Sequence, residues 1–172
     1  MASKGVEPFF LDTNILVAAT DASRNGHADC AELLRQGFEG RAALCCSNQV
    51  HREYLVVATR PVAVNGLGMT TSQATRNVER FQQAAAVLDD TVSSGKRLLG
   101  LVRKHRLVGK RIHDANLVAV SLERGIHRLV TLNPSDFAGF GDLLVLSPAE
   151  ALGEPGPRGP APDSPTDTPR KP

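Results

Sequence analysis

The chain has 172 residues, of which 41% are hydrophobic and 22% are charged. This composition fits one globular domain with a sizeable core and excludes a wholly disordered chain. The 20 basic and 18 acidic residues leave a net charge of only +2, which is too small for the chain as a whole to bind nucleic acid as a polycation. The three cysteines, Cys30, Cys45 and Cys46, include no C-x-x-C pair, which argues against a disulfide framework or a usual zinc motif.

Both ends of the chain differ from its middle. The first eight residues carry Lys4 and Glu7 and lack the apolar stretch of a signal peptide, and no apolar run reaches the roughly 20 residues of a membrane helix. We therefore expect a cytoplasmic protein with no membrane contact. Residues 153–172 hold the prolines at 155, 157, 160, 162, 165, 169 and 172 and almost nothing apolar, so we expect a disordered tail after one domain over residues 1–152.

Short apolar runs alternate with longer amphipathic segments between residues 6 and 150. The apolar runs predict strands at residues 9–11, 42–46, 86–88, 128–131 and 143–146. The amphipathic segments predict helices at residues 15–19, 28–38, 48–59, 71–85, 94–102 and 111–124. The helix at 28–38 is expected to bury Ala28, Ala31, Leu34 and Phe38, and residues 62–69 are expected to form a loop. Because helices of this length connect parallel strands, the fold class is α/β, with a mostly parallel sheet covered on both faces.

Three acidic residues stand close to the ends of predicted strands, where the ligands of parallel sheets collect. Asp12 directly follows the first strand, Glu53 lies in the helix after the second, and Asp114 lies near the start of the last long helix. Each has an ordinary interpretation when it is taken alone. Asp12 and Asp114 are typical of helix starts, where a carboxylate stabilises free N–H groups, and a glutamate in a helix is usually solvated.

Taken together, the three acids are more informative. Carboxylates that are held close repel one another and need a proton or a cation, and clusters of oxygen ligands suit Mg²⁺ or Mn²⁺. Such an ion lowers the pKa of a water molecule that it binds, and it shields the charge that develops on a phosphodiester during hydrolysis. The pattern therefore predicts a metal-dependent site that acts on nucleic acid.

Four segments of the chain resemble the signatures of PIN domains, in the order that this family has. Residues 9–16, FFLDTNIL, are similar to the opening hydrophobic-Asp-Thr-Asn signature, and residues 51–54, HREY, are similar to the second-acid segment. Residues 110–119, KRIHDANLVA, resemble the third-acid segment, and residues 129–137, LVTLNPSDF, resemble the terminal segment. The resemblance covers about residues 8–150 and is greatest to the VapC-like ribonuclease toxins of toxin–antitoxin pairs.

This resemblance implies a three-layer α/β/α sandwich and a ribonuclease that uses one or two Mg²⁺ or Mn²⁺ ions. Asp12, Glu53 and Asp114 would be its catalytic acids and metal ligands. PIN domains commonly have a fourth acid at the position of Asn133, where an amide brings no charge, so Asp136 is a second candidate for the fourth ligand. The residues expected to position water or carboxylates are Thr13, Asn14, Asn116 and Thr131.

The resemblance also implies an RNA substrate, a homodimer and a small antitoxin whose C-terminal segment blocks the acidic pocket. A basic stretch next to the third acid consists of Arg103, Lys104, Arg106, Lys110 and Arg111. A charge run is usually a solvated face, but beside an acidic pocket that must attract a polyanion we interpret this one as a phosphate contact. The apolar residues of the 62–69 loop, Val62, Val64, Leu67 and Met69, are a hypothetical interface.

Two other functions are compatible with the sequence. The first is an RNA-binding or protein-interaction module with a degenerate metal site, an interpretation that Asn133 favours. The second is a phosphatase or phosphotransferase that uses Asp12 as a covalent nucleophile. The second is disfavoured because the residue two positions after Asp12, where another aspartate is expected, is Asn14.

Overall fold

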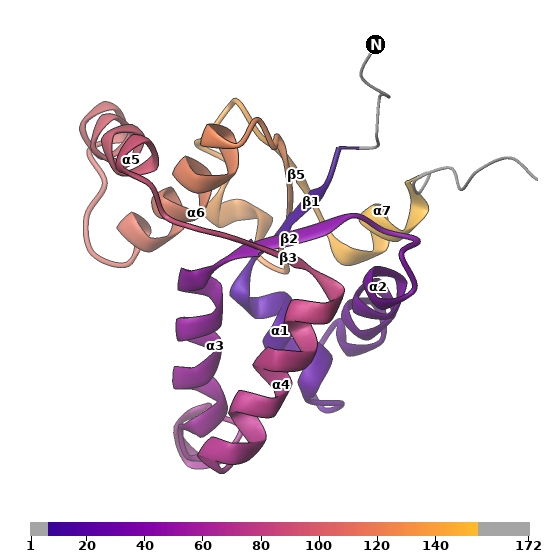
Figure 1. The fold of residues 1–172 in the computed structure, drawn as a ribbon. Coiled ribbons are helices and arrows are strands. Elements are labelled where there is room, and N and C mark those ends of the chain that lie inside the picture. Colours follow the sequence, from indigo (N-terminus) through magenta and orange to yellow (C-terminus); the bar gives the residue numbers. More distant parts are fainter. Residues whose placement is uncertain (1–6, 155–172) are drawn as a thin grey trace, which may run out of the picture.

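The computed structural model describes residues 7–154 of the chain. Five parallel strands form one sheet in the order β3-β2-β1-β4-β5 (Figure 1). The strands are β1 (Phe9–Leu11), β2 (Leu44–Ser47), β3 (Ala86–Leu88), β4 (Arg128–Val130) and β5 (Leu144–Leu146). The helices are α1 (Thr13–Thr20), α2 (His27–Phe38), α3 (Asn48–Thr59), α4 (Thr71–Ala84), α5 (Val92–His105), α6 (Arg111–Glu123) and α7 (Pro148–Gly153), with 3₁₀ turns η1 (Val62–Val64) and η2 (Pro134–Asp136).

The helices form two groups on the two sides of this sheet. On one side α5 packs against α6, and on the other α1, α2, α3 and α4 pack against one another, with α7 against α2 (Figure 1). The predicted α/β sandwich around a parallel sheet is confirmed. All five predicted strands exist, with ends that differ from the prediction by no more than two residues.

The central strand β1 sets the position of the first acid. Its three residues are all buried, as expected for a strand that is covered on both faces. Leu11 is in register with Val130, so β1 and β4 end side by side. The backbone N–H of Asp12 then donates to the carbonyl oxygen of Val130 at 3.0 Å. The residues that follow the two strands, Asp12 and Thr131, therefore meet at one edge of the sheet.

Two capping boxes mark helix starts that the sequence prediction did not place. The Thr91 hydroxyl accepts the N–H of Ser94 at 3.0 Å, and the Ser94 hydroxyl accepts the N–H of Thr91 at 2.8 Å. This capping box starts α5 at Val92, two residues before the predicted start, and α5 also continues beyond its predicted end to His105. The helix α7 was not predicted, because six residues are too few to show a helical period, although Ser147 and Glu150 form the same kind of capping box.

The buried face of α2 differs from the predicted one. Its buried residues are Cys30, Leu33 and Leu34, whereas Ala28 is exposed and Phe38 is 43% exposed. The reason is Gly37, where an added Cβ would overlap the carbonyl oxygen of Ala84 and the side chain of Leu44. Since α2 approaches its neighbours most closely at this glycine, its inner face runs through Cys30, Leu33 and Gly37, and the large Phe38 side chain is turned to the edge.

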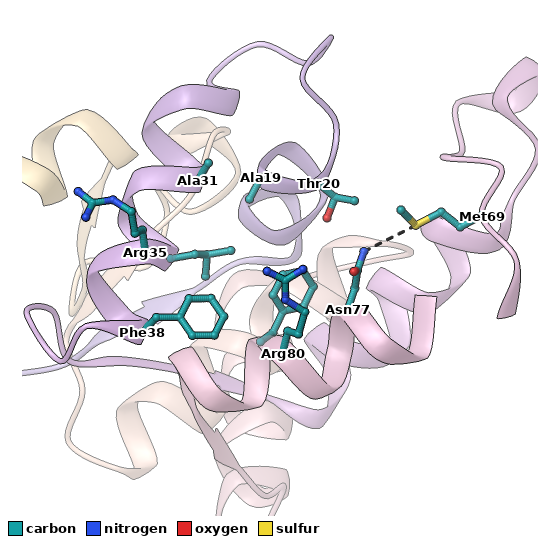
Figure 2. A pocket seen from close by; sticks show the side chains of 10 residues that line it. Ala19, Thr20, Ala31, Arg35, Phe38, Met69, Asn77 and Arg80 are labelled. Atoms are coloured by element: carbon teal, nitrogen blue, oxygen red, sulfur yellow. Dashed lines mark hydrogen bonds between the residues drawn. The ribbon is translucent and has the colours of Figure 1, made fainter. Parts of the chain in front are cut away.

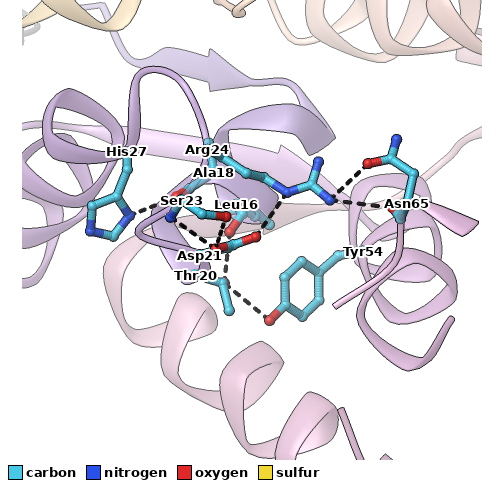
Figure 3. A network of polar contacts seen from close by, with 9 residues as sticks. All are labelled: Leu16, Ala18, Thr20, Asp21, Ser23, Arg24, His27, Tyr54 and Asn65. Atoms are coloured by element: carbon cyan, nitrogen blue, oxygen red, sulfur yellow. Dashed lines mark hydrogen bonds and ion pairs between the residues drawn. The ribbon is translucent and has the colours of Figure 1, made fainter. Parts of the chain in front are cut away.

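A polar network joins the loop after α1 to the loop after α3 (Figure 3). The Arg24 guanidinium lies 3.3 Å from the Asp21 carboxylate and donates to the backbone and side-chain oxygens of Asn65, both at 3.2 Å. Beside it, the Thr20 and Tyr54 hydroxyls lie 3.1 Å apart. These contacts fix residues 62–69 against the end of α1.

The loop at 62–69 also covers the C-terminal end of α3. The N–H groups of Leu67, Gly68 and Met69 donate to carbonyl oxygens of residues 57, 60 and 58 at 3.0, 2.8 and 2.8 Å. Of the four apolar residues of the hypothetical interface, Leu67 and Met69 pack against the core, and only Val62 and Val64 are exposed.

Two further expectations concerned a membrane-spanning helix and the proline-rich tail. Within residues 7–154, no helix combines the length and the apolar character needed to cross a membrane. The proline-rich tail predicted at 153–172 lies outside the described residues from position 155 onward, while Gly153 is the last residue of α7.

Candidate active site

Asp12 stands at the centre of the candidate site, one residue beyond β1. Its Oδ2 atom accepts hydrogen bonds from the Thr131 hydroxyl and the Asn14 amide, both at 2.7 Å. Asn14 also donates to Thr131 Oγ1 at 2.9 Å, and its own Oδ1 accepts the N–H of Leu132 at 3.1 Å. Although Asp12 precedes α1, its side chain makes no capping hydrogen bond to that helix. The carboxylate is therefore held from two sides, by Asn14 in the first turn of α1 and by Thr131 just after β4.

Glu53 is held by two hydrogen bonds from different elements. The Thr13 hydroxyl donates to Glu53 Oε2 at 2.7 Å, and the Gln49 amide donates to Oε1 at 2.7 Å. Gln49 is buried and also donates to the carbonyl oxygen of His113 at 3.1 Å. These contacts tie the second acid to α1 and to the start of α6.

Asn116 reaches this site only through Gln49. Its amide donates to Gln49 Oε1 at 2.7 Å and to Asp90 Oδ1 at 3.3 Å. The predicted role of Asn116 in positioning water or carboxylates stays a prediction, and its side-chain contacts are with the Gln49 amide and the Asp90 carboxylate. The sequence prediction missed Gln49, although its position four residues before Glu53, one helical turn away, was a signal for it.

The third acid, Asp114, lies in the first turn of α6 next to η2. Burial raises the pKa of Asp114, and the charge of Asp136 raises it further, while Arg111 and Lys110 oppose the shift. The Arg111 guanidinium donates to the carbonyl oxygen of Asp136 at 3.1 Å, which joins α6 to η2. The structure therefore brings Asp136 into the electrostatic environment of the third acid.

Asn133, the other candidate for the fourth ligand, enters the site through its backbone. Its N–H donates to Thr131 Oγ1 at 3.0 Å, and its carbonyl oxygen accepts the N–H of Asp136. Thr131 therefore accepts from Asn133 and Asn14 while it donates to Asp12. This arrangement uses the full hydrogen-bonding capacity of the hydroxyl, so its single O–H donor is directed at the carboxylate.

The Asp12 carboxylate is affected by the charges of both other acids. Its pKa is raised from 3.8 to about 6, mainly by burial and to a smaller extent by the charges of Asp114 and Glu53, against the lowering effect of the Thr131 hydrogen bond. The three predicted acids thus act on one another from separate elements. An anionic group in this position needs a compensating charge.

The chemistry of the donors fits a hard divalent cation. The acids offer only oxygen ligands, which Mg²⁺ and Mn²⁺ prefer, and both side-chain hydrogen bonds to Asp12 fall on the same oxygen, which leaves Oδ1 for a ligand. Among residues 7–154, however, no group of three His, Cys, Asp or Glu side chains is placed so that it could hold a metal ion. The acids therefore fit a divalent cation in their oxygen ligand atoms and in their negative charge.

The basic stretch divides into two parts. Lys110 and Arg111 act electrostatically on Asp114 and so flank the acids. Arg103 and Lys104 lie in the last turn of α5, where positive side chains offset the helix dipole, and Arg106 follows as the C-cap. The three residues of α5 are not among the charges that shift the pKa of Asp12 or Asp114.

A second hollow lies away from the acids, between α1, α2 and α4 (Figure 2). It has a volume of about 490 Å³, and none of its lining residues is acidic. The exposed ring of Phe38 and the side chain of Leu34 make much of its wall apolar. Exposed apolar surface of this kind is typical of a contact with a partner.

The five-stranded parallel sheet with helices on both sides, and the acid that follows its central strand, define an α/β protein with a polar site at the carboxyl end of the sheet. Residues 9–142 match the family model of the PIN domain, so this chain belongs to the PIN-domain family, as its sequence signatures indicated. A comparison with curated proteins gave no match.

Solved structures with this fold include several toxin–antitoxin complexes. A DNA-bound VapBC from Salmonella typhimurium is 23% identical with a TM-score of 0.57, and the match covers 83% of this chain and 99% of that one. A toxin–antitoxin complex from Klebsiella pneumoniae is 20% identical with a TM-score of 0.56, over 81% and 97%. VapC20 of Mycobacterium tuberculosis, described as a sarcin–ricin loop cleaving toxin, is 17% identical with a TM-score of 0.58, over 77% and 95%. At these identities the similarity shows a shared fold.

Proposed function

We propose that this protein is a cytoplasmic endoribonuclease that hydrolyses RNA phosphodiester bonds with Mg²⁺ or Mn²⁺, and that it is the toxin of a type II toxin–antitoxin pair. The observation that supports this most directly is that the charges of Glu53 and Asp114 both act on Asp12, which directly follows the central strand of a PIN-family fold. The fold shared with toxins of such pairs supports the biological role.

In this proposal the three acids hold one or two ions. Asp136 is the better candidate for a fourth ligand than Asn133, because its charge acts on Asp114. A bound divalent ion would supply an activated water and shield the charge that develops on the phosphate. Hydrolysis with this regiochemistry would add water at phosphorus, break the bond to the 3′ oxygen, and leave a 5′-phosphate and a 3′-hydroxyl.

The task of the surrounding residues is to hold the carboxylates in place before the ion arrives. Thr131 and Asn14 orient Asp12, while Thr13 and Gln49 orient Glu53. Partners of this kind keep ligands in position and are required for full metal affinity. On the rim, Lys110 and Arg111 attract the RNA, and Arg103, Lys104 and Arg106 extend the basic surface along α5.

The proposal includes a small antitoxin and a second copy of the chain as partners. Several solved structures with this fold are toxin–antitoxin complexes, and the apolar hollow beside Phe38 is a surface that an antitoxin segment would cover. A short reading frame that overlaps or adjoins the gene would support the toxin role, and its absence would leave the nuclease chemistry unaffected.

The direct test incubates the purified protein with RNAs of varied sequence and structure, with Mn²⁺ or with EDTA. We expect cleavage with Mn²⁺, none with EDTA, and none by the Asp12→Asn variant. Glu79→Gln, which neutralises an exposed acid on α4, is the matched control and should cleave normally. Equal cleavage by wild type and Asp12→Asn would refute the proposal, and RNA binding with no cleavage under any condition would favour a binding module with a degenerate metal site.

A further inference from the structure

A hollow beside Glu53 is not explained by the acids or by the basic stretch. It has a volume of about 320 Å³ and is lined by Thr13, Arg52, Glu53, Val56, Val57 and Arg60. Four of these six residues lie on α3, and Arg60 directly follows its last residue, so positions 52, 56 and 60 are spaced four residues apart. Thr13 and Glu53, which are joined by a hydrogen bond in the candidate active site, also line this hollow, so it lies directly beside the second acid.

The chemistry of the lining fits a strand of nucleic acid. Among residues 7–154, neither the Arg52 nor the Arg60 side chain makes a hydrogen bond or an ion pair, and both residues are exposed. Between them, Val56 is 56% exposed and offers an apolar surface. Two free guanidinium groups with an apolar patch between them suit two phosphates with a sugar or base between them.

The far end of this hollow is fixed by the loop at 62–69. The Arg60 carbonyl oxygen accepts the N–H of Gly68 at 2.8 Å, and Gly66 lies so close to the Arg60 backbone that an added Cβ would overlap it. Asn65 occupies the left-handed region at φ 62° and is held by Arg24 (Figure 3). The backbone that carries Arg60 is therefore rigidly held, which lowers the entropic cost of binding there.

We propose that Arg52 and Arg60 bind phosphates of the RNA nucleotides next to the cleaved bond, with Val56 against the sugar or base between them. This rests on the proposed function. Arg60 lies about 10 Å further along the α3 axis than Glu53, at 1.5 Å for each residue, which is beyond a phosphate held by the acids. Lys110 and Arg111 flank the acids at Asp114, and Arg52 and Arg60 flank them at Glu53, so cations at both ends draw the strand across an acidic centre that would otherwise repel it.

The test measures binding of a short fluorescein-labelled single-stranded RNA by anisotropy, in the Asp12→Asn background that prevents cleavage. The Arg52→Gln/Arg60→Gln double variant is compared with Arg76→Gln/Arg97→Gln, which removes two exposed arginines from α4 and α5. We expect weaker binding, and a slope of log affinity against log salt that is smaller by about 1.4, since each phosphate contact on a single strand contributes about 0.7. The control pair should leave the slope unchanged, and Arg52→Lys/Arg60→Lys should restore most of it.

Two outcomes overturn this proposal while the nuclease function stands. If the wild type cleaves RNA but the double glutamine variant keeps the full salt slope, the hollow does not bind phosphate. If the variant instead changes the oligomeric state in sedimentation and the slope for each chain is unchanged, this face is an interface between copies. By contrast, the proposed function itself fails if the wild type does not cleave RNA with Mn²⁺ and Asp12→Asn makes no difference.

Discussion

Replacing Asp12 by asparagine should make the metal-free protein more stable while it removes activity. The Asp12 carboxylate is pressed into a partly buried position beside Glu53 and Asp114, and this environment raises its pKa from 3.8 to about 6. Asparagine has the same shape and carries no charge, and its oxygen can still accept the 2.7 Å hydrogen bonds from Thr131 and Asn14. The substitution therefore removes the repulsion and keeps the contacts.

The size and sign of the effect follow from the two pKa values. The folded protein binds the Asp12 proton more tightly than the unfolded chain, so the free energy of unfolding falls as the pH rises from about 4 to about 6 and is constant above that. The difference between 3.8 and about 6 corresponds to about 3 kcal/mol, at about 1.4 kcal/mol for each pH unit. Above pH 7 the variant should gain up to this amount, or roughly 6–12 °C in Tm for a domain of this size.

The assay is urea or thermal unfolding followed by circular dichroism in EDTA, at about pH 4 and about pH 7.5. We expect the variant to exceed the wild type only at the higher pH, and Glu79→Gln to match the wild type at both. Adding Mn²⁺ should then stabilise the wild type and leave the variant unchanged, because only the wild type binds the ion at this carboxylate. A variant no more stable than the wild type at about pH 7.5 would show that Asp12 bears no uncompensated charge in the folded protein.

Other substitutions test the contacts around the acids and the loop that supports α3. Thr131→Val removes the donor to Asp12 and should lower activity or Mn²⁺ affinity by about 10- to 100-fold, measured by metal titration of the cleavage rate. Gln49→Ala should cause a loss of similar order in the same assay, since Glu53 loses one of its two donors. Gly66→Ala should lower the free energy of unfolding in urea by roughly 2–4 kcal/mol, because its methyl group would overlap a backbone carbonyl, whereas Gly100→Ala, which has open space in α5, should raise it by about 0.5–1 kcal/mol. Wild-type stability in Gly66→Ala would show that the loop yields easily.

The sequence predicted those features of the fold that depend on the local pattern of apolar and polar residues. The run Phe9 to Leu11 followed by Asp12 placed an acid at the end of a buried strand, and the structure has that arrangement. The face of α2 was wrong because hydrophobic periodicity does not show how closely two elements approach, and at Gly37 that distance decides which side is buried.

Pairings between distant residues were beyond the sequence. The hydrogen bond from Asn116 to Gln49 joins residues 67 positions apart, and nothing in either segment specifies the other. The same limit hid the hollow on α3, because Arg52 and Arg60 gain a shared role only when Thr13 from another helix closes the space beside them.

The strand order explains why Asp12 stands in a crevice at the end of the central strand. β2 and β3 lie on one side of β1, and β4 and β5 lie on the other. After β1 the chain therefore first forms the strands on one side of β1 and later crosses to form the strands on the other side. A crevice forms at the carboxyl end of the strand where the direction reverses, and the first residue beyond β1 stands in it. Thr131 reaches this place from the second half of the chain and donates a hydrogen bond to the carboxylate. Asp12 is thus held firmly at a place where its negative charge destabilises the folded protein. A cation bound there would remove this destabilisation, and the difference would contribute to the free energy of cation binding.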